Sequence, residues 1–236
     1  MRVAIVETME NTRLGSVGEA LHRAGAELST VRAWLGEAIP ADSDGYDALV
    51  VPGGWPSALD DHKYPYLLQI MELMQSFGAA DKAVLGICLG SQLLARAYGG
   101  RNELDGIREF GWMHLSLTQD GQNDPLFANV DHCFRSFQWH RDTFSLPENA
   151  VRLVTGERVQ NQCFRIGRAS YGVQFHFEAN RNVVEAWTQE NPGRVEAMCP
   201  NWFASSASES AMHSEEADRA GQMIAMAFVK AISGVT

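Results

Sequence analysis

Residues 83–92 read AVLGICLGSQ, in which an apolar run passes through Cys88 into a helix-like segment. Ala83–Ile87 predicts a buried strand, and Leu89–Tyr98 predicts a helix that ends before a pair of glycines. Glycines stand two positions before and two after the cysteine, where a sharp turn brings neighbouring backbone segments close together. This is the nucleophile-elbow pattern with Cys in place of Ser, and it predicts that Cys88 lies at the carboxyl end of a central parallel strand.

The first hundred residues alternate strand-like and helix-like segments. The predicted strands are Arg2–Val6, Glu27–Val31, Asp47–Val51 and Ala83–Ile87, and the predicted helices are Leu14–Ala24, Tyr66–Phe77 and Leu89–Tyr98. Such alternation is typical of α/β proteins, so we expect a central, mainly parallel sheet with helices on both faces.

After Gly100 the pattern changes to short strands separated by turn residues. The candidates are Phe110–Thr118, His132–Phe137, Val151–Thr155, Gln162–Ile166 and Tyr171–Phe177, which predict a smaller antiparallel excursion. Asn191–Ser214, with two prolines and many serines, predicts an irregular segment, and Glu215–Ile232 predicts a C-terminal helix. Because no Pro/Gly/Ser-rich or highly charged linker divides the chain, we expect residues 1–236 to form a single domain.

The charge and the length of the apolar runs limit the binding partners and the cellular location that we expect for this protein. The formal net charge of −10 argues against binding to nucleic acid or to an anionic membrane surface. The apolar run after Met1-Arg2 stops at Glu7, which is too short for a signal peptide, and no run approaches the roughly 20 residues that span a bilayer. We therefore expect a cytoplasmic protein without nucleic-acid or membrane partners.

The four cysteines show neither a metal-binding nor a disulfide pattern. Cys88, Cys133, Cys163 and Cys199 form no Cys-x-x-Cys pair, so we expect reduced thiols and no metal site. Cys133 and Cys163 lie in apolar, strand-like stretches where burial is expected. Cys88 is expected to be the most accessible and reactive thiol, because a helix N-terminus favours the thiolate. The elbow pattern alone also suits a buried core cysteine.

A histidine and a carboxylate stand two residues apart near the end of the last predicted strand. Residues two apart in a strand share a face, so His176 and Glu178 are expected to point the same way while Phe175 and Phe177 pack. A carboxylate beside an imidazole fixes its tautomer and stabilises the imidazolium, which a Cys–His pair needs. On its own, the pair also suits a surface contact at a strand end. The chain order of nucleophile, histidine and acid differs from that of α/β-hydrolases, in which the acid precedes the histidine.

Taken together, these segments resemble the class I glutamine amidotransferases. Residues 86–92 are similar to their Gly-x-Cys-x-Gly-x-Gln motif, and residues 174–178 to their Gln-Phe-His-Pro-Glu motif. Residues 52–54 resemble the glycine-rich turn that completes their oxyanion hole, and residues 138–142 resemble a loop that helps hold glutamine. The resemblance covers about residues 1–190 and is strongest to stand-alone members that look like the glutaminase domain of GMP synthase.

The resemblance implies a flavodoxin-like class I glutaminase fold and a reaction without metal or cofactor. It implies that Cys88 attacks the side-chain amide of glutamine to form a glutamyl thioester. His176 would exchange the protons and Glu178 would orient His176. The oxyanion would be held by the N–H groups of Gly54 and Leu89. The implied substrate-binding residues are Gly53, Gln92, Trp139 and His140. A plain polar residue in the first helical turn is the competing interpretation of Gln92.

Two positions depart from the family pattern. Phe177 stands where proline is usual, so the His–Glu turn is less restricted and gains an N–H donor. Trp55 follows Gly54 where a proline is common, which changes the expected shape of the oxyanion loop. Neither departure removes a reacting group.

Three functions are compatible with these motifs. The leading hypothesis is a glutaminase that supplies ammonia to a separate synthase, because no synthase domain is expected after residue 190 of this chain. The second is a hydrolase of another γ-glutamyl compound, a peptide or an amine, since only the leaving amine differs. The third is a non-catalytic binding or stress-response protein on the same fold, whose thiol would not be acylated.

Overall fold

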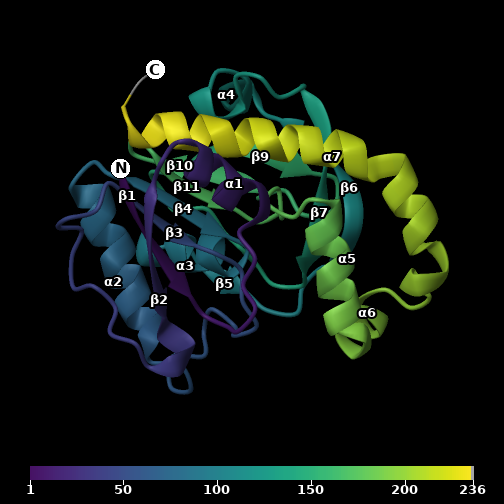
Figure 1. The fold of residues 1–236 in the computed structure, drawn as a ribbon, viewed down its shortest axis with the longest axis horizontal. Helices are drawn as coiled ribbons and strands as arrows, with labels where there is room; N and C mark the ends of the chain where they lie inside the picture. Colours follow the sequence, from purple (N-terminus) through teal and green to yellow (C-terminus); the bar gives the residue numbers. More distant parts are fainter. Residues whose placement is uncertain (235–236) are drawn as a thin grey trace.

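The centre of the structure is a parallel sheet built from the first half of the chain and from residues near 170 (Figure 1). The computed structural model describes residues 1–234. The parallel strands, in spatial order, are β2 (Glu27–Arg32), β1 (Arg2–Glu7), β3 (Ala48–Val51), β4 (Ala83–Ile87) and β11 (Ser170–Val173). β3 and β4 are buried along their whole length, which explains their continuous apolar sequences. β4 lies between β3 and β11, so the predicted central position of the strand before Cys88 is confirmed.

The later strands extend the same sheet beyond β11 in antiparallel fashion. In spatial order they are β10 (Cys163–Ile166), β9 (Val151–Gly156), β6 (Glu109–Leu117) and β7 (Cys133–His140). A separate two-stranded antiparallel sheet is formed by β5 (Asn102–Glu103) and β8 (Thr143–Phe144). The predicted α/β architecture, with parallel strands first and antiparallel strands later, is confirmed.

Helices cover both faces of the sheet. α1 (Gly15–Arg23) and α7 (Trp202–Ile232) pack on one face, and α2 (Tyr66–Ala79) and α3 (Leu89–Ala97) pack on the other. The alternation of side chains along β1 explains why both faces need helices. Val3 and Ile5 pack in the core with α1 and α7, whereas Ala4 and Val6 pack on the other face with α2 and α3. The shorter helical elements are η1 (Ala33–Leu35), α4 (Gln119–Gln122), η2 (Pro125–Phe127), α5 (Arg181–Glu190) and α6 (Pro192–Met198).

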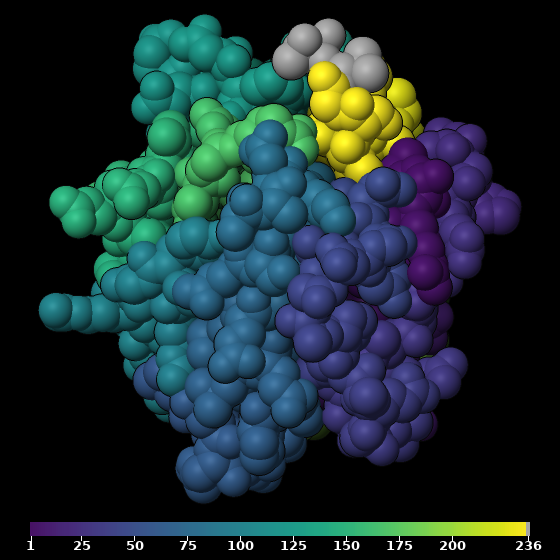
Figure 2. Space-filling view, turned by 90° about the vertical axis from the view of Figure 1, so that its left-hand side faces the viewer, coloured from purple at the N-terminus to yellow at the C-terminus, as the bar shows by residue number. Residues whose placement is uncertain are grey.

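The early and late parts of the chain form one continuous surface. Figure 2 looks at the side that carries α2 and shows the early segments (purple to blue) packed against later ones (teal to green), with the C-terminal helix (yellow) at the top. Within residues 1–234, no helix combines the length and the apolar character needed to cross a membrane.

The segment after residue 190 differs from the prediction. An irregular stretch is predicted over Asn191–Ser214, but α6 and the first part of α7 occupy it, so that prediction is wrong. α7 begins at Trp202, whose indole is buried against Phe110 and Trp112 at ring-centroid distances of 4.9 and 5.8 Å. This contact fixes the first turn of the helix. Tertiary packing therefore overrides the weak helix propensity of the serine-rich sequence.

The turn at Cys88 leaves no space for side chains on its flanking glycines. A Cβ on Gly86 would lie 2.3 Å from the Gly90 carbonyl oxygen, and a Cβ on Gly90 would lie 2.0 Å from the Val51 carbonyl oxygen. Both obstacles are backbone atoms, so rotation of a side chain cannot relieve the overlap. The two glycines thus allow α3 to pack directly against β3 and β4.

We expect Gly90→Ala to lower the free energy of unfolding by about 2–3 kcal/mol, because the added methyl group pushes α3 away from β3. Urea unfolding followed by circular dichroism measures the change. Gly193→Ala is the matched control, since a Cβ at that position meets no atom within 4 Å. An unfolding midpoint for Gly90→Ala equal to that of the control would contradict the close packing of the turn.

Candidate active site

Cys88 occupies the turn between β4 and α3 with φ +50° and ψ −106°. A non-glycine residue in such a conformation costs about 1–3 kcal/mol, so the surrounding structure must hold it in place. Its N–H donates to the Val173 carbonyl of β11 at 2.8 Å, and its thiol lies 3.9 Å from the Trp139 carbonyl. The residue is only 8% exposed. The strand–turn–helix context predicted for Cys88 is therefore confirmed, but the side chain is less accessible than predicted.

The other three thiols show that accessibility does not distinguish Cys88. Cys163 is buried, as predicted, and this burial, together with the negative charge of Asp124, raises the pKa of its thiol. Cys133 was expected to be buried but is exposed, because it begins β7 at the edge of the sheet. Cys199 is partly exposed. Cys88 differs from the other three cysteines in its neighbours, which include His176 and the glycine turn at Gly53.

His176 and Glu178 lie in a bend and turn after β11, and not in a strand that extends to Phe177. β11 ends at Val173, and the His176 N–H then donates to the Phe137 carbonyl at 2.8 Å in a single bridge to β7. The chain turns at once, so that His176 Nδ1 and Glu178 Oε1 lie 2.7 Å apart. The predicted strand geometry is therefore wrong, while the predicted contact between the two side chains is present.

Packing on several sides fixes this turn. The Glu178 carbonyl accepts a hydrogen bond from the Ser16 N–H, at the start of α1, at 2.9 Å. A Cβ on Gly221 of α7 would lie 2.1 Å from the Phe177 carbonyl oxygen, so α7 packs directly on the turn. The Phe177 side chain is buried, with its ring centroid 6.3 Å from that of Phe175. The phenylalanine that replaces the usual proline is therefore held by packing.

The environment of His176 favours its protonated form. Burial opposes the charge and lowers the pKa, but the adjacent Glu178 carboxylate and a hydrogen bond with Cys88 outweigh burial and raise the pKa to about 10. Both side chains of the pair are buried, and the imidazole meets the Trp187 ring edge-on at a centroid distance of 5.1 Å. At neutral pH, His176 is thus an imidazolium that pairs with Glu178 and can stabilise a thiolate on Cys88.

We expect Glu178→Gln to lower the pKa of His176 well below 10, because the amide keeps the shape but removes the charge that favours the imidazolium. NMR titration of the His176 imidazole in ¹⁵N-labelled protein measures this change. Glu72→Gln, an exposed site on α2, is the matched control and should leave the titration near 10.

The titration of His176 also makes the free energy of unfolding depend on pH. Because the native pKa of His176 lies above the ordinary 6.5, its protonation stabilises the fold fully below pH 6.5, and this contribution is lost as the pH rises through about 10. In Glu178→Gln the loss should occur at lower pH. An identical His176 titration in the two proteins would contradict the assigned role of the carboxylate.

The glycine turn after β3 lies against both Cys88 and His176. A Cβ on Gly53 would be 3.3 Å from Cys88 Cβ and 3.1 Å from His176 Cε1. A Cβ on Gly54 would be 3.0 Å from the Leu89 side chain. The Leu89 N–H belongs to the first residue of α3, where no intrahelical acceptor exists. The two residues predicted for the oxyanion hole, Gly54 and Leu89, therefore lie next to each other and line one cavity together with Cys88.

The predicted substrate-binding residues Gln92 and His140 belong to a buried, hydrogen-bonded wall. Gln92 Nε2 donates to the Asp142 carbonyl at 3.1 Å. His140 lies between two acceptors, with Nδ1 3.2 Å from the Asp142 carbonyl and Nε2 3.0 Å from Glu109 Oε2. Gln162 Nε2 also donates to Glu109 Oε2, at 2.7 Å. These contacts hold the loop after β7. Glu109 was not predicted as part of the site, although a carboxylate at the start of an apolar strand was a usable signal.

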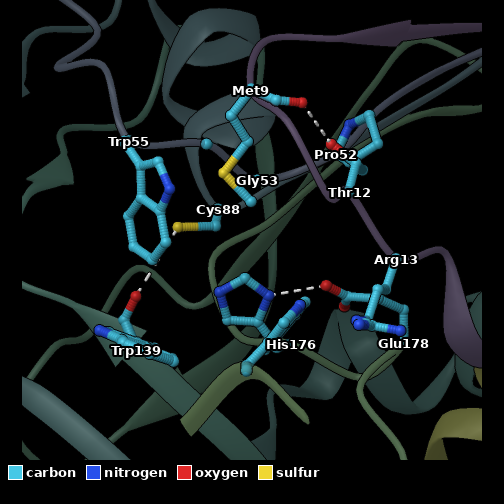
Figure 3. A pocket seen from close by; sticks show the side chains of 12 residues that line it. Met9, Thr12, Arg13, Pro52, Gly53, Trp55, Cys88, Trp139, His176 and Glu178 are labelled. Atoms are coloured by element: carbon cyan, nitrogen blue, oxygen red, sulfur yellow. Dashed lines mark hydrogen bonds and ion pairs between the residues drawn. The ribbon is translucent and has the colours of Figure 1, made fainter. Parts of the chain in front are cut away.

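Two cavities meet at Cys88, and Gly54, Trp55 and Trp139 line both of them. The first, called here the histidine cavity, has a volume of about 50 Å³ and is completed by Met9, Thr12, Arg13, Pro52, Gly53, His176, Glu178 and Trp187. The second, the arginine cavity, has a volume of about 300 Å³ and includes Leu89, Gln92, Arg108, His140, Arg141, Asp142, Arg194 and Met198. In Figure 3 the Trp55 and Trp139 side chains lie on one side of the sulfur, and His176 and Glu178 lie on the other.

The last part of the site comes from α5 and α6 and was not predicted from the sequence. Trp187 on α5 lines the histidine cavity, and Arg194 and Met198 on α6 line the arginine cavity. The Arg194 guanidinium lies over the Trp55 ring, 4.2 Å from its centroid. These residues were missed because no local motif marks them and α6 itself was not predicted. In the described part of the chain, no group of three or more His, Cys, Asp or Glu side chains is placed to hold a metal ion.

Comparisons with known proteins agree with the fold and the motifs. The family model for "Glutamine amidotransferase class-I" matches residues 14–186. The glutamine amidotransferase-like protein YfeJ of Salmonella typhimurium is 33% identical over 170 residues, which cover 71% of each chain. A glutamine-hydrolysing GMP synthase of Christiangramia forsetii is 32% identical over 143 residues, which cover 59% of this chain and 26% of that protein. The crystal structure of a glutamine amidotransferase from Thermotoga maritima has a TM-score of 0.82 and 26% identity, with 98% of this chain and 97% of that chain covered.

Proposed function

The chain belongs to the class I glutamine amidotransferase family, and we propose that it hydrolyses the side-chain amide of glutamine through Cys88, His176 and Glu178. The observation that carries this proposal is the buried His176–Glu178 pair beside a strained cysteine, at the junction of two cavities. A His–Glu pair with a purely structural role would not require a thiol held at φ +50° next to it.

The first half of the proposed reaction forms a thioester. The Cys88 thiolate attacks the amide carbon of glutamine, the new C–S bond forms, and the carbonyl electrons move onto oxygen. The N–H groups of Leu89 and Gly54 hold this oxyanion, and the loss of one such donor costs about 10²–10³ in rate. The His176 imidazolium gives its proton to the amide nitrogen as the C–N bond breaks, and ammonia leaves.

The second half of the reaction returns the enzyme to its starting state. Neutral His176 takes a proton from water, the resulting hydroxide attacks the thioester carbon, and the C–S bond breaks to release glutamate and the thiolate. His176 is then an imidazolium again, stabilised by Glu178. The high pKa of His176 suits the first half, in which it acts as the acid, and the positive charge pairs with the thiolate between turnovers.

The two cavities support ammonia as the leaving group. The general acid must face the departing amine, and His176 and Glu178 line the histidine cavity only. This cavity has a volume of about 50 Å³, which is room for a few water-sized molecules. Ammonia or a small amine fits inside such a space, whereas a peptide leaving group would have to extend beyond it. Glutamine therefore takes precedence over γ-glutamyl peptides as the proposed substrate.

The fate of the ammonia follows from the relatives. The chain spans 26% of the length of the Christiangramia forsetii GMP synthase, a protein described as glutamine-hydrolysing. By analogy, we propose that this chain passes ammonia to a separate synthase. Because a free thiolate must stay reduced, we place the reaction in the cytoplasm.

The test is ammonia release from glutamine by the purified protein, alone and with candidate synthases. The same preparations are assayed with γ-glutamyl peptides and γ-glutamyl amines. Faster release from glutamine is the expected result. Preference for a γ-glutamyl peptide would assign the second function class, and the absence of both turnover and thiol acylation would support a non-catalytic protein.

A further inference from the structure

The arginine cavity carries positive charge that the chemistry at Cys88 does not use. Its lining includes Arg108, Arg141 and Arg194 but only one acidic side chain, Asp142. This concentration stands out because the chain as a whole has a formal net charge of −10. Guanidinium groups in a cleft bind carboxylates through charge-assisted, often bidentate, hydrogen bonds. The cavity is therefore suited to the anionic part of a ligand.

Arg194 is the arginine of this cavity whose guanidinium N–H groups have no acceptor among the described residues. Arg141 Nε lies 3.3 Å from the Asp105 carboxylate, and Arg108 Nη1 donates to a backbone carbonyl of α6 at 3.2 Å. Within residues 1–234, Arg194 has no carboxylate in ion-pair distance. Its guanidinium instead stacks on the Trp55 ring at 4.2 Å. Stacking on the ring uses the flat face of the guanidinium. The N–H groups at its edge are left to donate hydrogen bonds to a ligand.

The chemistry at Cys88 determines which end of the substrate meets Arg194. Because the leaving amine must face His176, it occupies the histidine cavity. The acyl part then extends in the other direction, into the arginine cavity, which Cys88 and Leu89 line but His176 does not. The acyl part of a γ-glutamyl substrate ends in an α-amino group and an α-carboxylate. The carboxylate thus enters the cavity whose wall carries Arg194.

We propose that Arg194 binds the α-carboxylate of the γ-glutamyl group and that Trp55 positions its guanidinium. This inference rests on the proposed function and deepens it, because it names the substrate class. The enzyme acts on free γ-amides with an unsubstituted α-carboxylate, which a cavity of about 300 Å³ accommodates. Glutamine residues inside a polypeptide, whose carboxyl group is bound in an amide, are excluded. α6 is then the element that determines specificity on the acyl side.

The test measures binding separately from turnover. Isothermal titration calorimetry compares Cys88→Ser with Cys88→Ser/Arg194→Ala, using L-glutamine and 4-aminobutanamide, which is glutamine without its α-carboxylate. Loss of Arg194 is expected to weaken glutamine binding about ten-fold or more, down to the affinity of 4-aminobutanamide, and to leave 4-aminobutanamide unchanged. Arg194→Lys keeps the charge and should retain part of the affinity. Arg23→Ala, on α1 and outside both cavities, is the matched control and should change neither ligand.

Three outcomes overturn the inference: equal glutamine affinity with and without Arg194, equal loss of affinity for both ligands, and no binding of glutamine to Cys88→Ser. Ammonia release by the wild-type enzyme is measured in parallel. Release combined with an unchanged affinity in the Arg194 variant discards the role of Arg194 alone. No release from glutamine or from other γ-glutamyl amides discards the proposed function.

Discussion

Replacing Cys88 by serine is expected to lower ammonia release from glutamine by about 10⁴-fold or more while glutamine still binds. The reason lies in the charge state of His176. The Glu178 carboxylate raises the pKa of His176, so the imidazole favours its protonated form and is a poor base for a serine hydroxyl. A serine hydroxyl is far less acidic than a thiol and would have to lose its proton to such a base before it could attack. A coupled enzymatic assay for ammonia measures the loss.

Covalent labelling provides the control for the choice of nucleophile. One equivalent of an electrophilic glutamine analogue is expected to label Cys88 and stop ammonia release. Cys133 is exposed and Cys199 is partly exposed, so a general alkylating reagent should label them without regard to the substrate site. Peptide mass mapping separates the two patterns. Labelling by the analogue mainly at Cys133 or Cys199, with activity lost in parallel, would contradict the assignment of Cys88.

Replacing His176 by alanine is expected to lower turnover by about 10⁴-fold, because it removes the group that we propose as both the acid for ammonia and the base for water. In this proposal it also removes the cation that pairs with the nucleophile. Glu178→Gln should retain measurable activity, since the amide keeps the imidazole in place and loses only the charge. Steady-state kinetics of both variants measure this difference. Wild-type activity in both variants would contradict the roles assigned to the pair.

Folding must be checked for the histidine variant. His176→Ala leaves the Glu178 carboxylate buried without its partner, and such a loss costs about 3–5 kcal/mol of stability. Thermal unfolding at the assay pH shows whether the protein is folded during the measurement. His62→Ala, at an exposed position, is the matched control and should change neither stability nor turnover. Added imidazole that restores activity to folded His176→Ala would assign the loss to the chemistry.

The fold was predictable where one short stretch encodes its own geometry. The apolar run Ala83–Ile87, the glycines around Cys88 and the following helix specify a strand, a tight turn and a helix without help from distant residues. The contact between His176 and Glu178 was predicted for the wrong reason. The chain leaves β11 at Val173, and backbone contacts with β7, α1 and α7 bend it into the turn that joins the two side chains.

The rest of the site depends on contacts between segments far apart in the sequence. Glu109 meets His140 across the pair β6–β7, and Arg194 meets Trp55 across more than half the chain. A periodic pattern within one segment of the sequence cannot indicate contacts between distant segments. The start of α7 was missed for the same reason, because Trp202 packs on β6 and thereby makes a helix of a serine-rich segment. Residues within short sequence motifs were therefore easier to predict than the cavity walls, which segments far apart in the sequence build together.

The position of α7 has a consequence for biosynthesis. Val3 and Ile5 of the first strand share a core with Ile224 and Phe228 of the last helix, and Gly221 of that helix packs on the turn between His176 and Glu178. A nascent chain on the ribosome therefore covers this face of its first strand only in part, with α1, until residues 202–232 have been made. Contacts of such long sequence separation form late and slowly. The turn that joins His176 to Glu178 thus gains its packing against α7 only after this helix has emerged.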